Sequence, residues 1–258
     1  TTNTNNGTIN WNYSIAEGYL NFLAAGENVT AVFTVTVIDN NGSTLTQDVT
    51  VNITGTNDTP TITTVANTTD VTGAVIEDVA VVAATLTDTG TITFNDLDLT
   101  NTHTASVTRV SSSSLQGGTL TLGDVSEDAT TTAGSVPWTY TVANSATQYL
   151  AAGQTASEVF TVTISDINGG TVTQNVTVTA TGTNDAPVIN AITTTALNEQ
   201  TNTTALTTSI PVTFTDVDLI DTGHIASITN VVASGITTGL ALDQTALRAL
   251  VNPGTVTK

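Results

Sequence analysis

Apolar residues alternate with threonine along much of this chain. In residues 160–164, FTVTI, every second side chain is apolar, and residues 172–180 continue the pattern after the turn Asp166-Ile167-Asn168-Gly169. A period of two is that of a β-strand with one buried face, and the turn residues favour a tight hairpin. Residues 33–53 repeat this arrangement around Asp39-Asn40-Asn41-Gly42. The pattern therefore predicts two antiparallel hairpins.

The rest of the pattern is also typical of short strands. Residues 241–251 are the one segment whose sequence would allow a short helix. Many short strands with turns at regular spacing predict an all-β fold made of tandem immunoglobulin-like β-sandwiches. The chain has two tryptophans, each with a tyrosine two residues later, and we expect all four in the cores: Trp11, Tyr13, Trp138 and Tyr140.

The chain repeats itself. Residues 11–60 match residues 138–187 without a gap, at an offset of 127 positions (138 − 11 = 127). Residues 94–107 match residues 214–228 with one inserted residue. Because self-similarity at a fixed period marks repeated structural units, we expect one complete repeat over residues 58–184. Residues 1–57 would then be the C-terminal half of another repeat, and residues 185–258 the N-terminal half of a third.

The charge of the chain restricts its partners. Asp and Glu total 22 against 3 Lys and Arg, which gives a net charge of −19. Nucleic acid is excluded as a partner because binding phosphates needs a basic face, and anionic membrane surfaces are disfavoured for the same reason. The chain has no cysteine and no apolar run long enough to span a membrane. Cations are the natural partners.

Carboxylates gather at the predicted junctions between repeats. The sequence Gly-Thr-Asn-Asp occurs at residues 55–58 and again at 182–185, Asp96-Leu97-Asp98 follows a predicted strand over 89–95, and Asp166 opens a hairpin turn. In an immunoglobulin-like sandwich these segments lie at one end. We therefore expect one cluster at the first junction, formed by Asn57, Asp58, Asp96, Asp98 and Asp166.

Such a cluster requires a cation or protonation. Two like charges about 4 Å apart cost roughly 4 kcal/mol at an effective dielectric constant near 20. Calcium (Ca2+) fits best because it accepts six to eight oxygen ligands in flexible geometry, whereas magnesium demands a tight octahedron and zinc prefers nitrogen and sulfur. Each motif alone is also compatible with a turn whose aspartate bonds the nearby backbone. His103 and His224, which follow the Asp-x-Asp loops, are expected to form structural hydrogen bonds.

The ordered combination of VIED, FNDLDLTNTHTASV, WTYTV, YLAAGQ, FTVTISDINGG and TGTNDAPVI resembles the VCBS repeat of very large bacterial surface adhesins and related RTX-type proteins. The resemblance covers essentially the whole chain. It implies a secreted or cell-surface protein made of many tandem repeats, usually exported by type I secretion and involved in adhesion or biofilm formation.

A looser similarity to cadherin repeats implies roles for particular residues. Glu77 stands where cadherins place a calcium-binding glutamate, and the similarity implies that it acts at the second junction with Asn184, Asp185, Asp216 and Asp218. Glu199 would serve the junction after that. The acidic pair that cadherins place before their penultimate strand is replaced by residues 150–154, LAAGQ. One or two ions per junction are therefore expected rather than three.

Three functions follow from these features. The first is a calcium-stiffened spacer of an extracellular bacterial adhesin, whose partners are the neighbouring repeats. The second is an adhesive module that binds a glycan or a protein receptor, although aromatic residues are only 4% of the chain. The third is a self-associating filament subunit in which incomplete repeats complement each other between molecules. No nucleophile elbow, zinc-type histidine spacing or phosphate loop is present, so we expect no enzymatic activity.

Overall fold

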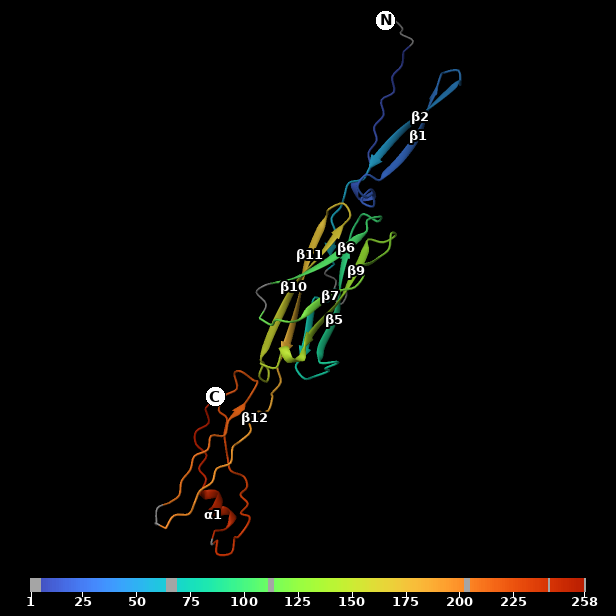
Figure 1. Cartoon of the computed structure of the whole chain (residues 1–258). Coiled ribbons are helices and arrows are strands. Elements are labelled where there is room, and N and C mark those ends of the chain that lie inside the picture. Colours follow the sequence, from blue (N-terminus) through green and yellow to red (C-terminus); the bar gives the residue numbers. More distant parts are fainter. Residues whose placement is uncertain (1–5, 64–68, 111–113, 202–204, 241, 258) are drawn as a thin grey trace. The chain divides into compact units, whose positions relative to one another are not determined.

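The computed structural model describes residues 6–63, 69–110, 114–201, 205–240 and 242–257 (Figure 1). The chain divides into two compact units. The first unit comprises Thr1–Thr147 and Thr155–Thr181, and the second comprises Gln148–Gln154 and Gly182–Lys258. The repeat boundaries at residues 58 and 184 stay a prediction.

The first unit contains a sandwich of two sheets (Figure 1). One sheet has the order β4 (Thr72–Ile76), β11 (Thr171–Thr181), β10 (Thr155–Asp166) and β6 (His103–Arg109). The other has the order β3 (Thr61–Ile62), β5 (Thr85–Asn95), β9 (Ala133–Ala143) and β7 (Thr119–Leu122), with β8 (Ser126–Glu127) also pairing with β9.

The strand order identifies the fold. The segment before β5 contributes β3 to one sheet and β4 to the other, where β4 runs parallel to the last strand, β11. The other strand pairs are antiparallel. This division of the first strand between two sheets, with β11 and β10 lying between β4 and β6 in the second sheet, is the Greek-key arrangement of immunoglobulin-like and cadherin-like sandwiches. The predicted all-β fold class is confirmed.

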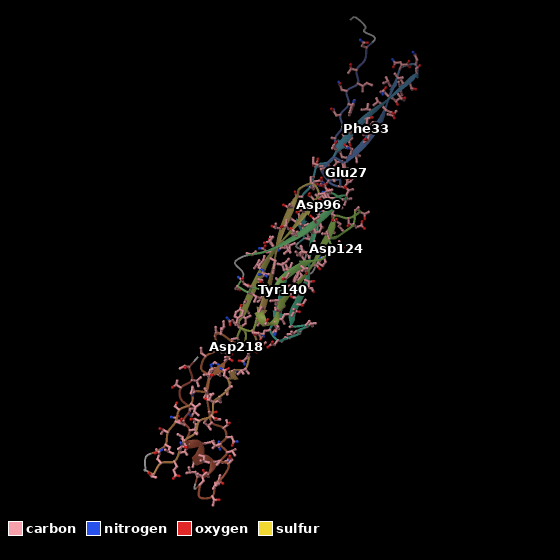
Figure 2. The ribbon with its side chains drawn as sticks, in the orientation of Figure 1. Glu27, Phe33, Asp96, Asp124, Tyr140 and Asp218 are labelled. Atoms are coloured by element: carbon pink, nitrogen blue, oxygen red, sulfur yellow. The ribbon has the colours of Figure 1, made fainter. Side chains whose placement is uncertain are left out.

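Alternating residues of the strands fill the space between the sheets. Along β10, every second side chain is buried, including Phe160, Val162 and Ile164. Trp138 and Tyr140 of β9 are buried as predicted, and Figure 2 marks the position of Tyr140 in the sandwich. A Cβ on Gly90 would lie 2.4 Å from Cζ2 of Trp138, so the indole needs a glycine on the neighbouring strand. The threonines between the apolar positions face outward, which explains the period of two.

A separate hairpin precedes the sandwich in the first unit. It consists of β1 (Asn28–Ile38) and β2 (Thr44–Thr54), after a single 3₁₀ turn, η1 (Glu17–Tyr19). The predicted strands are confirmed, but the prediction of a core position for Trp11 is wrong, since its exposed fraction is 51% against 1% for Trp138. Tyr13 is only half-buried. Within the described residues, β1 and β2 pair only with each other, so no second sheet covers these rings.

The second unit has little regular structure. β12 (Val188–Ile189) pairs with β13 (Phe214–Thr215), and the helix α1 (Gln244–Ala249) lies within the range predicted to be helical, of which residue 241 is outside the described part. Oδ1 of Asp243 caps the helix by accepting from the N–H of Ala246 over 2.7 Å. No helix in the described ranges is both long enough and apolar enough to cross a membrane. Many large apolar side chains of this unit are exposed.

Candidate metal centre

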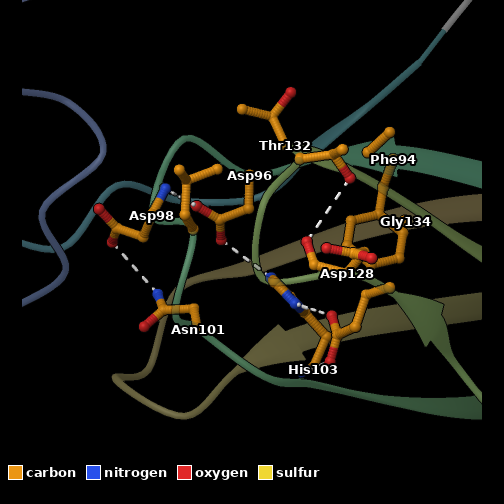
Figure 3. Close-up of a pocket in the computed structure, with 12 residues that line it drawn as sticks. Phe94, Asp96, Asp98, Asn101, His103, Asp128, Thr132 and Gly134 are labelled. Carbon is orange, nitrogen blue, oxygen red and sulfur yellow. Dashed lines mark hydrogen bonds and ion pairs between the residues drawn. The ribbon is translucent and has the colours of Figure 1, made fainter.

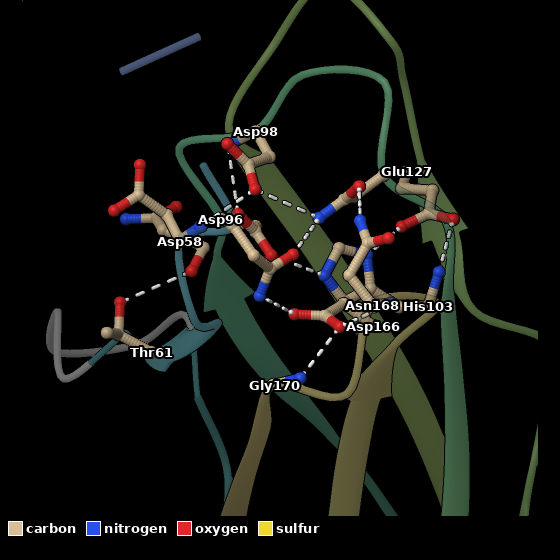
Figure 4. A network of polar contacts seen from close by, with 12 residues as sticks. Asp58, Thr61, Asp96, Asp98, His103, Glu127, Asp166, Asn168 and Gly170 are labelled. Carbon is tan, nitrogen blue, oxygen red and sulfur yellow. Dashed lines mark hydrogen bonds and ion pairs between the residues drawn. The ribbon is translucent and has the colours of Figure 1, made fainter. Parts of the chain in front are cut away.

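The strand topology brings the predicted residues of the first junction to one end of the sandwich. β5 ends at Asn95, as predicted, so that Asp96-Leu97-Asp98 opens the following loop. β10 ends at Asp166, and Asn57-Asp58 precedes β3. Figure 4 shows Asp58, Asp96, Asp98 and Asp166 close together, although they come from three segments that are distant in sequence.

Hydrogen bonds join all five predicted residues. The backbone N–H of Asp58 donates to Oδ2 of Asp98 over 2.8 Å, and the N–H of Asp98 donates to Oδ1 of Asp96 over 2.9 Å. Nδ2 of Asn57 donates to Oδ2 of Asp166 over 3.0 Å. The structure therefore brings together the residues that the sequence predicts to meet, with Asp58 bonded to Asp98 through its backbone N–H.

Asn101 connects these bonds into one network, and sequence reasoning missed it. Its Nδ2 lies 3.2 Å from Oδ1 of Asn57 and 3.1 Å from Oδ2 of Asp98, and its Oδ1 accepts from Nδ2 of Asn168 over 2.9 Å. The repeat alignment contained the signal, because Asn101 matches Asp221 three residues after the Asp-x-Asp motif. We refer to Asn57, Asp58, Asp96, Asp98, Asn101 and Asp166 as the first-junction cluster.

Asp96, Asp98 and Asp166 of this cluster are buried, and the charges of the neighbouring aspartates act on Asp98. Burial raises the pKa of Asp98, and the charges of Asp96, Asp58 and Asp166 raise it further against the opposing hydrogen bond from the N–H of Asp58. Burial also acts to raise the pKa of Asp166, but hydrogen bonds from Asn57 and from the backbone of its own turn outweigh burial and lower it. Asp98 is thus the carboxyl of the cluster whose ionised form is disfavoured by its surroundings.

An oxygen of Asp98 lacks a partner. The residue is 2% exposed, and its Oδ1 accepts no hydrogen bond. Asp98 also lines a cavity of about 20 Å³, together with Asp96, Asn101, His103 and Glu127 among others (Figure 3). A polar space of this size holds one water molecule or one small ion. The residue that has a buried carboxylate oxygen without a donor therefore also lines a space large enough for a cation.

The side chains present fit calcium by type. The cluster offers four carboxylates and the amide oxygens of Asn57 and Asn101, which are the hard oxygen ligands that calcium prefers. No Lys or Arg competes within the described residues, since Arg109 pairs with Glu158 and Arg248 donates to a backbone carbonyl. As they stand, no three His, Asp or Glu side chains in the described ranges form a group that could hold an ion. An ion would thus depend on the amides or on a small closure of the loops.

His103 has the structural role expected of it. Its Nε2 lies 2.9 Å from Oδ2 of Asp96, and its Nδ1 lies 2.7 Å from Oε2 of Glu127. Both ring nitrogens can donate at once only when the imidazole is protonated. Glu127 was missed in the sequence because it lies in β8, far from any junction motif. The histidine fixes the orientation of Asp96 from behind the cluster.

A further carboxylate approaches from the segment before the hairpin. Oε1 of Glu27 accepts from Oγ1 of Thr100 over 2.7 Å, and Thr100 follows Asp98 by two residues. Oε2 of Glu27 accepts from the N–H of Ala24 over 3.0 Å. The repeat offset could have identified this residue, since Glu27 matches Gln154, whose Oε1 accepts from the N–H of Ala151. The glutamate ties the hairpin segment to the loop that carries Asp98.

The second unit repeats the arrangement. The N–H of Asp185 donates to Oδ2 of Asp218 over 3.0 Å, and the N–H of Asp218 donates to Oδ1 of Asp216 over 3.1 Å. Nε2 of His224 lies 2.7 Å from Oδ2 of Asp216. Nδ2 of Asn184 bonds the carbonyl of Asp185. The same three contacts therefore recur around the second Gly-Thr-Asn-Asp motif.

Glu77 belongs to the first unit. It follows β4 directly, is fully buried, and donates its N–H to the carbonyl of Thr181 over 2.9 Å. Its predicted participation in calcium binding with the aspartates of the second unit stays a prediction.

No protein-family model and no curated protein matches the chain. Among solved structures, the CooA pilin subunit from enterotoxigenic Escherichia coli matches with 10% identity and a TM-score of 0.33, covering 48% of this chain and 99% of the pilin. Cadherin-like domains 1 to 4 of zebrafish RET match with 16% identity and a TM-score of 0.32, covering 61% of this chain and 34% of RET.

The Enterococcus faecalis MSCRAMM ACE, whose structure is described as binding ligands by the collagen hug model, matches with 11% identity and a TM-score of 0.22. That match covers 59% of this chain and 60% of ACE. The fold assignment rests on the strand order described above rather than on these similarities.

Proposed function

We propose that this chain is a calcium-binding spacer module of an extracellular bacterial adhesin of the VCBS-repeat type. The observation that carries the proposal is the buried Oδ1 of Asp98, which has no hydrogen-bond donor and lies in a cluster of carboxylates beside a small polar cavity. Burial, and then repulsion from Asp96, Asp58 and Asp166, raises the pKa of Asp98, and a divalent cation there would offset both effects by stabilising the ionised carboxylate.

The position of the cluster suggests what the ion does. Asn57 and Asp58 lie between the hairpin segment and β3, whereas Asp96, Asp98 and Asp166 belong to the loops of the sandwich. An ion that binds both sets of oxygens restricts the backbone where one repeat follows another. In a tandem array, this restriction would convert flexible junctions into stiff ones and hold a distal adhesive domain away from the cell.

The composition supports an extracellular, calcium-rich setting. Carboxylates dominate the charged residues, and the absence of cysteine leaves metal ions as the available cross-links. Binding a ligand to the folded state alone at about 100 times its Kd stabilises that state by about 2.7 kcal/mol. The proposal therefore predicts that calcium raises the melting temperature of the chain and that chelation lowers it.

The experiment compares two matched aspartates. Oδ1 of Asp166 accepts from the N–H groups of Asn168 and Gly170, and Oδ1 of Asp39 accepts from Asn41 and Ser43 in the equivalent turn of the hairpin. Only Asp166 also contacts the cluster, through Asn57. Asp166→Asn should abolish most of the calcium-induced rise in melting temperature, whereas Asp39→Asn should preserve it. Equal calcium responses of the two variants would count against the proposal.

A further inference from the structure

β4, near the start of the sandwich, runs parallel to β11, its last strand. The two stay in register over all five residues of β4. Before β4, the carbonyl of Val71 accepts from the N–H of Thr177 over 2.9 Å. After β4, the N–H of Glu77 donates to the carbonyl of Thr181 over 2.9 Å. The hydrogen-bond ladder between the two segments therefore extends one residue beyond each end of β4.

The chain enters and leaves this sandwich at opposite ends. Asp58 precedes β3 and lies at the end that holds the first-junction cluster. β11 begins at that same end, directly after the turn that Asp166 forms with Gly170. At roughly 3.3 Å per residue, its 11 residues carry the chain about 33 Å to the other end (Figure 1). Tension along the backbone therefore pulls β4 and β11 in opposite directions along their own axes.

The direction of pulling decides how such a ladder breaks. When two strands are peeled apart from one end, their hydrogen bonds break one after another. When they are pulled lengthwise, all the bonds share the force and have to break together. Because forced unfolding is governed by the unfolding rate, a ladder that is loaded lengthwise raises the force at which the domain unfolds.

The ladder is protected on its inner side. Gly73, Val75 and Glu77 point into the sandwich and are buried, whereas the residues between them are exposed. A Cβ on Gly73 would lie 2.9 Å from Cγ2 of Val178, so the two strands pack closely. Water therefore cannot reach the bonds from the core side to replace them as they break.

The opposite sheet also holds β4 in place. Nε1 of Trp138 in β9 donates to the carbonyl of Asp70, two residues before β4, over 2.7 Å. The N–H of Ala74 in β4 donates to Oδ2 of Asp88 in β5 over 2.6 Å. Sliding β4 along β11 would break these contacts together with the ladder.

We propose that the parallel pair of β4 and β11 is a mechanical clamp that keeps the repeat folded under tension. The inference rests on the proposed function for the source of the tension, since a spacer in a tandem array transmits the pull on a distal adhesive domain. The clamp itself is formed by backbone hydrogen bonds of one sandwich and requires no metal.

Pulling single molecules from two pairs of attachment points tests the clamp. The natural chain has no cysteine, so introduced cysteines give unique sites for DNA handles on the whole chain. Thr56→Cys with Ala186→Cys places the handles beyond opposite ends of the sandwich and loads the ladder lengthwise. Val79→Cys with Ala186→Cys is the matched control, because both handles then lie beyond the same end and peel β11 from β4. All three positions are exposed, and thermal melts check that the two variants are equally stable.

Both variants are pulled in EDTA at the same loading rate, and the length of chain released identifies the unfolding of the sandwich. The clamp predicts that lengthwise pulling requires at least about twice the force that peeling requires. Any smaller ratio, including equal forces, would overturn the proposal.

The use of EDTA separates the clamp from the calcium site. The ratio of forces does not depend on whether the first-junction cluster binds an ion. Equal forces would therefore overturn the clamp and leave the calcium proposal standing. A chain with the predicted ratio but no calcium response would support the clamp and contradict the calcium site.

Discussion

The backbone N–H of Asp58 donates to Oδ2 of Asp98 over 2.8 Å, although the two residues are 40 positions apart. The corresponding bond between Asp185 and Asp218 measures 3.0 Å across 33 positions. The segment of chain between the paired residues differs in length, but the contact recurs. The Asp-x-Asp motif is therefore held against the Asn-Asp motif by the fold, and not by local turn geometry alone.

Removing the charge of Asp98 should separate stability from calcium binding. Asp98→Asn keeps the shape of the side chain but ends the repulsion from Asp96, Asp58 and Asp166. We expect the variant in EDTA to melt at or above the temperature of the natural protein. In calcium it should lack most of the stabilisation, about 2.7 kcal/mol for an ion at 100 times its Kd. Thermal melts at several calcium concentrations measure both effects, and a full calcium response in the variant would exclude Asp98 as a ligand.

The metal-free protein should have a pH-dependent stability set by Asp98. A carboxyl whose folded pKa is raised contributes stability that is fully present below its unfolded pKa, and that is lost as the pH rises through the folded value. The free energy of unfolding in EDTA should therefore decrease as the pH rises above the ordinary value of 3.8, to an extent that Asp98→Asn abolishes. Urea unfolding between about pH 4 and 7 gives the measurement.

Asp166 should affect the pH dependence of stability in the opposite direction to Asp98, and in a lower pH range. Its folded pKa is lowered, so its contribution is present above the unfolded value and is lost as the pH falls through the folded one. The free energy of unfolding of the natural protein should therefore fall as the pH drops below the ordinary pKa value of 3.8, and Asp166→Asn should remove this fall. Identical pH profiles of the Asp98 and Asp166 variants would contradict the assignment.

A buried polar contact should stabilise the sandwich core independently of calcium. The hydroxyl of Tyr140 donates to Oε2 of the fully buried Glu158 over 2.6 Å. Tyr140→Phe should cost about 1–3 kcal/mol, because a buried carboxylate loses a donor. Tyr13→Phe is the matched control, since position 31, which matches Glu158, holds alanine. Chemical unfolding in EDTA compares them, and equal costs would show that the Glu158 contact contributes nothing.

The junction glycines should be needed for space. A Cβ on Gly55 would lie 2.3 Å from the carbonyl oxygen of Leu23, and one on Gly182 would lie 2.0 Å from that of Leu150. Either alanine variant should lose about 1–3 kcal/mol, as overpacked sites do. Gly18→Ala has open space around its Cβ and serves as the control. The result is measured by thermal unfolding, and a neutral Gly55→Ala would show that the junction backbone can shift freely.

The period of two along the strands predicted the fold because the sandwich buries one face of every long strand. The strand ends next to Asp96 and Asp166 followed from the same pattern, and so did the meeting of the carboxylates, since an antiparallel sandwich returns those loops to one end. Glu127 and Asn101 could not be found from the period of two along the strands. Their roles depend on the path of a loop and of a two-residue strand, for which the sequence carries no periodic signal.

The error at Trp11 has a related cause. Repeat matching aligns Trp11 with Trp138. Burial, however, depends on what covers the position, and the hairpin pairs only with itself in the part of the chain that the structure describes. Sequence similarity between repeats therefore transfers strand register, but it does not transfer the environment of a side chain.

The location of a bound ion tests the central claim most directly. Crystals grown or soaked with calcium, or with a lanthanide as its anomalous substitute, should show an anomalous peak about 2.3–2.6 Å from Oδ1 of Asp98, with further oxygens from the first-junction cluster around it. A well-ordered cluster without a peak at saturating metal, and with Asp98 bonded only to protein or water, would contradict the calcium site and the stiffening role proposed for it.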